Sequence, residues 1–167
     1  AGNVAMLQAI AALCSAEGGR AELDIDQNGA RGSLVGSFGR PGEGLNLVLA
    51  GRTDGFPQDR ARWHGDPYRL TRRDGRLIGA GTADMKGFIA CVLAALPDLA
   101  RHAARPSSGC LRLVLSFDIA ARGLGDQRLG ARLARDRVGP AIAIVGEPTG
   151  MRIVEGHKAC LEYRLRI

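Results

Sequence analysis

The sequence predicts an α/β fold in which an open mixed β-sheet is flanked by helices. Three apolar runs, at residues 45–50, 111–115 and 141–145, have the composition of buried strands, and a carboxylate follows each of them. A long helical pattern lies between the first two runs, and strands that alternate with helices are typical of an open α/β sheet. With 167 residues, the chain can bury one substantial core.

The N-terminal third is expected to contribute one helix and two strands. An alanine-rich helix is predicted over residues 4–14, with Asn3 as a candidate N-cap and Gly18-Gly19 ending the helix. Strands are predicted at residues 21–26 and 33–38, because turn-forming residues separate these two apolar stretches.

The central helix is predicted over residues 85–99, where apolar residues recur at helical spacing and Pro97 disturbs only the last turn. Asp84 stands at its start, on the glycine-flanked turn 81–87. A carboxylate at this place either caps the helix through its free backbone amides or is presented to a metal ion. The local sequence leaves both interpretations open.

Carboxylates also follow the strands. Asp54, Asp118 and Glu147 come after the three apolar runs, and ligand crevices of open α/β sheets lie beyond the carboxyl ends of the strands. We therefore expect these acids and Asp84 to converge on one rim of the sheet. Four carboxylates at one place repel one another unless a cation neutralises them.

The chain resembles the acetylornithine deacetylase branch of the aminoacylase and desuccinylase metallohydrolases over nearly its whole length. The resemblance rests on five ordered motifs: Trp63-His64-Gly65-Asp66-Pro67, Arg73-Asp74-Gly75-Arg76-Leu77, residues 79–87, Val145-Gly146-Glu147-Pro148-Thr149-Gly150 and Val154-Glu155-Gly156-His157-Lys158. It implies a three-layer catalytic domain like that of zinc-dependent exopeptidases.

The resemblance also implies a site with two zinc (or cobalt) ions that hydrolyses the amide of an N-acyl amino acid, as in arginine biosynthesis. By position, Asp84 would bridge the two metals and Glu147 would bind the first. Asp54 would orient a metal-bound histidine. Two close cations lower the pKa of a bound water and stabilise the oxyanion of the intermediate.

Three positions depart from the family pattern. Arg52 stands where the family has the histidine of the first metal, and a protonated guanidinium has no lone pair to donate. Ile119 stands at the general-base position, and Ala120 replaces a glutamate ligand of the other metal. A zinc site normally needs three protein ligands, so we expect no ordinary zinc hydrolase activity from this chain by itself.

Histidines elsewhere do not obviously replace the missing ligands. His64 stands where the family has a small polar residue, His102 is expected in a loop after the central helix, and His157 lies in a motif not known for ligation. We expect a structural role for each.

The cation of Arg52 suggests a sharper hypothesis: it occupies the place of the missing metal and pairs with Asp84 and Glu147. Arg52 and Asp54 are two apart on an extended segment, so their side chains point to the same side, and a guanidinium can bridge several carboxylates. The alternative is that the long side chain of Arg52 extends into solvent and makes no specific contact.

The expected organisation is a partial catalytic domain, residues 1–158, followed at 159–167 by the first strand of a lid domain that the chain lacks. A homodimer is expected only where that lid is present. Two function hypotheses follow. The chain is either an impaired acetylornithine deacetylase-like enzyme, completed by residues beyond 167 or by a partner, or a silent relative that serves as an interaction module or is a fragment.

Charge and composition bear on partners and location. The net charge of +6 comes from 23 basic and 17 acidic residues, and the basic group Arg128, Arg132, Arg135 and Arg137 is expected to be a solvated helix face. With few aromatic residues nearby, we expect no nucleic-acid binding. Four widely spaced cysteines favour a reducing cytoplasm. No stretch approaches the roughly 20 apolar residues of a membrane span.

Overall fold

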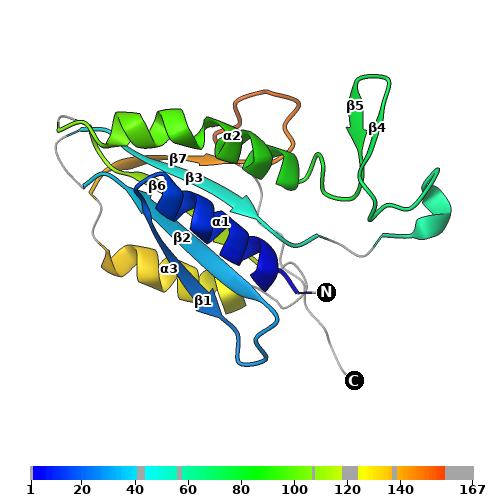
Figure 1. Ribbon diagram of the computed structural model, residues 1–167, viewed down its shortest axis with the longest axis horizontal. Helices are drawn as coiled ribbons and strands as arrows, with labels where there is room; N and C mark the ends of the chain where they lie inside the picture. Colours follow the sequence, from blue (N-terminus) through cyan, green and yellow to red (C-terminus); the bar gives the residue numbers. More distant parts are fainter. Residues whose placement is uncertain are drawn as a thin grey trace.

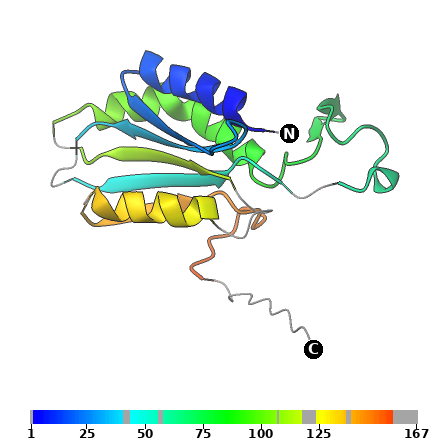
Figure 2. The ribbon, with the colours of Figure 1, turned by 90° about the horizontal axis from the view of Figure 1, so that it is seen from below.

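The computed structural model describes residues 2–40, 44–55, 58–106, 108–117, 124–136 and 139–156, with the side chains of 124–127 left aside. Their main feature is a sheet with helices on both faces: α1 and α2 cover one face and α3 the other (Figures 1 and 2). The helices are α1 (Val4–Ala16), α2 (Lys86–Ala103) and α3 (Leu124–Arg135), with a short 3₁₀ turn η1 (Arg60–Arg62). The strands are β1 (Arg20–Ile25), β2 (Gly32–Phe38), β3 (Asn46–Arg52), β4 (Thr71–Arg73), β5 (Arg76–Ile78), β6 (Leu111–Ser116) and β7 (Ala141–Val145).

The main sheet has the strand order β1-β2-β6-β3-β7, and the hairpin β4-β5 projects from one end of the molecule (Figure 1). β2 pairs antiparallel with β1 and with β6, whereas β3 pairs parallel with β6 and with β7. The mixed α/β sheet expected from the sequence is therefore confirmed. Because β3, β6 and β7 are parallel, their carboxyl ends meet at the same edge.

The main core lies between this sheet and helices α1 and α2. Its most enclosed side chains are at most 1% exposed: Leu7, Cys14, Leu34, Leu96, Leu113 and Leu115. A smaller core of Val35, Val114 and Leu129 lies under α3 on the other face. Burying a leucine contributes about 1.5–3 kcal/mol, so these two cores are what hold the helices onto the sheet.

The central helix is longer than the sequence suggested. α2 continues to Ala103, so Pro97 lies inside it, and His102 belongs to its last turn rather than to a loop. Ala100 and Ala103 are 6% and 5% exposed and pack into the main core. Tertiary packing of this face sustains the helix beyond the proline, which lacks one backbone donor.

Asn3 is the N-cap residue of α1, as predicted, but its side chain makes no capping hydrogen bond to the helix. Two other predictions were wrong about solvent exposure. The strand at β7 is exposed at every residue, because it is an edge strand that pairs only with β3 among the described strands. Arg132 is not simply solvated: its side chain is 27% exposed and is paired with Glu22 of β1, whereas Arg128 and Arg135 are exposed.

The predicted lid strand at 159–167 lies outside the described residues, as does Arg137. Within the described part of the chain, every helix is too short or too polar to cross a lipid bilayer.

Candidate functional site

The guanidinium of Arg52 lies between two carboxylates at the carboxyl edge of the sheet. Its Nη2 atom is 3.0 Å from Oε1 of Glu147 and 3.7 Å from Oδ1 of Asp84. The Arg52 side chain is 32% exposed, and those of Asp84 and Glu147 are 42% and 45% exposed. The hypothesis that Arg52 pairs with both acids is confirmed, and the alternative of a side chain without specific contacts is wrong. We call these three residues the Arg52 site.

Strand register brings Arg52 and Glu147 together. In the parallel pair of β3 and β7, Ala50 is opposite Val145, and the N–H of Gly146 donates to the carbonyl of Ala50 at 3.0 Å. Arg52 and Glu147 stand two residues beyond this matched pair. Arg52 is the last residue of β3, and Glu147 lies two residues past the end of β7, at the same edge of the sheet.

Asp84 reaches the Arg52 site because the first turn of α2 packs closely against β3 and the end of β7. A Cβ atom on Gly146 would lie 2.2 Å from Cδ1 of Phe88, and one on Gly51 would lie 3.1 Å from Cγ1 of Ile89. Only a glycine fits beside Phe88 at this spacing. The two glycines therefore let α2 approach, and Asp84 immediately precedes that helix.

Asp84 does not cap α2. The N-cap residue is Met85, which is 1% exposed and makes no side-chain capping bond. The preceding turn contains Gly81 at φ +85°, and the N–H of Lys86 donates to the Gly81 carbonyl at 3.0 Å. The peptide bond between Asp84 and Met85 is cis. The carboxylate of Asp84 is thus presented to Arg52 rather than to the helix amides.

Thr53 anchors this edge of the sheet, and sequence reasoning missed it. It is 4% exposed, and both its N–H and its hydroxyl donate to the carbonyl of Ser116 at 2.9 Å. The amide of Asn3 donates to the Thr53 hydroxyl at 2.7 Å and to the Gly32 carbonyl at 2.8 Å. The end of β3 is therefore tied to β6, β2 and the start of α1. The sequence did contain a sign of this role. Side chains alternate along an extended segment, so Thr53 is expected on the side opposite to Arg52 and Asp54.

The other predicted site residues are only partly described. Asp54 is half-buried directly after Thr53, and its role as an orienting acid stays a prediction. Asp118, Ile119, Ala120 and His157 lie outside the described residues. His64 is exposed in a loop.

The donor set of the Arg52 site does not fit the first metal implied by the resemblance. A zinc ion needs three protein ligands in such a site, and the guanidinium takes the third position without a lone pair. Across the described residues, no group of three or more His, Cys, Asp or Glu side chains is arranged to hold a metal ion. The charge of the two carboxylates is instead partly neutralised by Arg52.

Comparison with known proteins identifies a family and several relatives that this chain is similar to. Residues 48–160 match the profile of peptidase family M20/M25/M40. The acetylornithine deacetylase of Pasteurella multocida (strain Pm70) is 37% identical over 168 residues, which cover 99% of this chain and 41% of that protein. The chain therefore spans about two fifths of the length of this relative.

Solved structures show the same fold at low sequence identity. Human carnosine dipeptidase 1 is 20% identical with a TM-score of 0.69, over 85% of this chain and 32% of that chain. The M20 family metallo-carboxypeptidase Sso-CP2 from Sulfolobus solfataricus is 14% identical with a TM-score of 0.67, over the same shares. Since the family profile matches more than half of its residues, this chain belongs to peptidase family M20/M25/M40.

Proposed function

We propose that this chain is an acetylornithine deacetylase-like member of the family, of the class that hydrolyses the amide of N-acyl amino acids, and that its own hydrolysis is impaired. The class is supported by 37% identity to an acetylornithine deacetylase along 99% of the chain. The impairment is supported by one observation, the position of Arg52 between Asp84 and Glu147.

A guanidinium and a metal ion differ in what they do for amide hydrolysis. Both neutralise carboxylates, but a metal ion also offers a coordination position at which a water molecule loses a proton near neutral pH. Arg52 offers only N–H donors. Family members are metallopeptidases, and zinc or cobalt is the metal we propose for relatives with a complete site. In this chain one guanidinium partly neutralises the two carboxylates of the Arg52 site.

The proposal extends to ligand, partners and location. The ligand is a small N-acyl amino acid, as expected in arginine biosynthesis. No nucleic-acid or membrane partner is proposed, and dimerisation is proposed only for a form that carries the lid. The proposed location is the cytoplasm.

A second candidate function is a silent interaction module or fragment. Arg52 favours it too, since a guanidinium holds the two acids together without any metal. Ile119 at the general-base position adds to this, because an aliphatic side chain cannot accept a proton.

Hydrolysis and binding assays together test the two functions. The purified chain is incubated with N-acetylornithine and zinc, with or without a chelator, and acetate release is followed. Impairment predicts no chelator-sensitive release, and such release would contradict it. Calorimetric titration of the same compound then separates the candidates: binding without turnover supports the impaired enzyme, and no binding at millimolar ligand supports the silent module.

A further inference from the structure

We propose that an arginine-lined hollow beside α3 binds a small phosphorylated anion. The hollow has a volume of about 490 Å³ and is lined by residues of β1, β2 and β6, by the last turn of α3 and by the residue that follows it. Arg112 stands near the amino end of β6, whereas Arg52 is paired with Ser116 at the carboxyl end. The hollow is therefore separate from the Arg52 site, and the inference does not rest on the proposed function.

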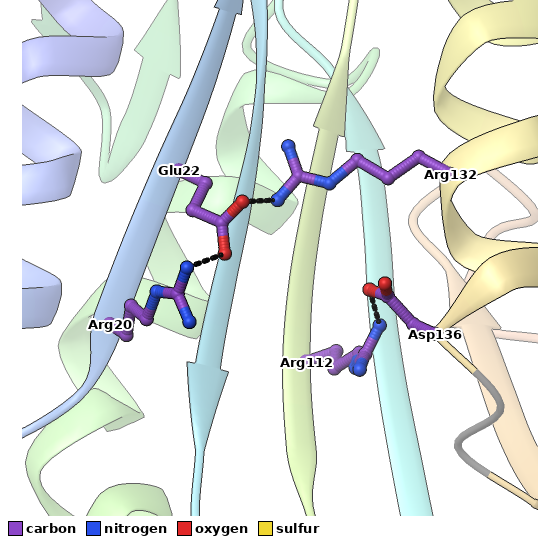
Figure 3. Close-up of polar contacts among 5 residues, drawn as sticks. All are labelled: Arg20, Glu22, Arg112, Arg132 and Asp136. Atoms are coloured by element: carbon purple, nitrogen blue, oxygen red, sulfur yellow. Dashed lines mark hydrogen bonds and ion pairs between the residues drawn. The ribbon is translucent and has the colours of Figure 1, made fainter.

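Strand register assembles the floor of the hollow. Arg20 of β1 is opposite Ser37 of β2, which in turn is opposite Arg112 of β6. Residues directly opposite one another share a face of the sheet, so two guanidinium groups and a hydroxyl lie in one row. Arg132 reaches the hollow from α3, and Asp136 lies just past the end of that helix (Figure 3). These five side chains come from four separate elements and their ends.

The charges of the hollow leave a positive excess. Glu22 is engaged by two arginines: Arg20 lies 2.9 Å from its Oε1 and Arg132 pairs with its Oε2 (Figure 3). Asp136 accepts from Nη1 of Arg112 at 2.7 Å. Three guanidinium groups thus face two carboxylates, and each guanidinium has five N–H donors. Donors outnumber the acceptors, which is the condition for capturing an anion.

Arg112 provides the strongest indication of a ligand. Its side chain is only 9% exposed, and its buried Nε atom has no hydrogen-bond partner within the described part of the chain. A buried charged donor without an acceptor is costly, so an oxygen acceptor at this point would be stabilised. Gly18, Gly19 and Gly39 line the hollow as well.

The directions of the donors favour a phosphoryl group over a carboxylate. A carboxylate offers two oxygens in one plane, whereas a phosphoryl group offers oxygens at tetrahedral angles. Here the guanidinium groups approach from β1, from β6 and from α3, so an oxyanion whose oxygens point in several directions can use all three. We therefore assign the hollow to tetrahedral phosphoryl oxygens.

Titration of the chain with inorganic phosphate at constant ionic strength tests the assignment. Calorimetry is run on the natural sequence and on Arg20→Gln and Arg132→Gln. Arg20 is 79% exposed, so its replacement leaves the fold intact. Arg73→Gln is the matched control, because Arg73 is 72% exposed and also pairs with a nearby acid, Asp74, but lies on the β4-β5 hairpin. Each hollow variant is expected to weaken phosphate binding about tenfold, the usual effect of losing a charge-assisted hydrogen bond, and the control to leave it unchanged.

A second measurement follows Arg112 itself. The ¹⁵Nε resonance of its guanidinium should shift when phosphate is added to the natural sequence. The assignment is overturned if phosphate does not saturate at millimolar concentration, if Arg20→Gln and Arg132→Gln bind it as the control does, or if this resonance stays in place. Acetate that binds as tightly as phosphate would also overturn it.

Discussion

Replacing Arg52 with histidine is expected to turn the Arg52 site into a zinc site. Asp84 and Glu147 already face the same point from the start of α2 and the end of β7. Histidine is the residue that the family resemblance implies at position 52. The variant would therefore hold three protein ligands, the number that a zinc site with one open position needs.

The geometry of the natural site sets the size of the effect. Zinc lies about 2.0–2.2 Å from a carboxylate oxygen, so an ion on Glu147 would be about 4 Å from the Arg52 guanidinium. Charges of +2 and +1 at that distance repel by about 2 kcal/mol in a water-like dielectric, which is suitable because both carboxylates are more than two fifths exposed. This repulsion weakens zinc binding about 30-fold. A histidine removes the repulsion and adds a ligand, so we expect zinc to bind at least about 100-fold more tightly.

Calorimetric zinc titration, with elemental analysis after dialysis, measures the change. Arg52→Gln is the matched control, because glutamine removes the same charge without adding an imidazole. Arg52→Gln should bind zinc about 30-fold more tightly than the natural chain, because only the repulsion is removed. Arg52→His should bind zinc more tightly than Arg52→Gln. Zinc uptake by Arg52→His should also weaken as the pH falls below about 6.5, because protonation of the imidazole competes with the metal.

Two results would refute this reasoning. The natural chain could bind stoichiometric zinc through Asp84 and Glu147, which would mean that the guanidinium does not exclude it. Alternatively, Arg52→His could bind zinc no better than Arg52→Gln, which would mean that position 52 does not face the ion.

Three other predictions concern stability and reactivity. Thr53→Val should lower the free energy of unfolding, measured by urea denaturation, by about 1–3 kcal/mol, because the carbonyl of Ser116 loses one of its two donors from residue 53 and the amide of Asn3 loses an acceptor. Thr53→Ser should retain most of the stability, because it keeps the hydroxyl. Leu113→Ala should cost about 2–5 kcal/mol in the same assay, because Leu113 is 1% exposed in the main core. A thiol reagent should label exposed Cys91 well before Cys14, whose burial raises its thiol pKa and lowers its thiolate fraction.

Each of these has an outcome that would contradict it. If Thr53→Val were as stable as Thr53→Ser, the hydroxyl of Thr53 would not anchor the end of β3. Leu113→Ala no more destabilising than Leu45→Ala would contradict the core assignment, since Leu45 is 65% exposed. Equal labelling rates at Cys14 and Cys91 in the folded chain would show that Cys14 is accessible.

The sequence by itself determined the strands of the main sheet, the central helix and the residues of the Arg52 site, but not the hairpin β4-β5. β3 and β6 form where the apolar runs predict strands, and α2 forms where the helical spacing predicts a helix. Both patterns are local, because each places the apolar residues on the side of the element that is buried. The departure at Arg52 was visible too, because it lies within a motif. The end of α2 was not predictable, since burial of Ala100 and Ala103 carries the helix past Pro97.

Only the tertiary structure decided which of these side chains meet. The register of β3 against β7 and the close approach of α2 at Gly146 place one guanidinium between two carboxylates. The hollow of Arg20, Arg112 and Arg132 depends even more on the sheet order, because strand pairing joins residues about ninety positions apart. Periodicity shows which face a residue takes, but pairing between distant strands determines its neighbours.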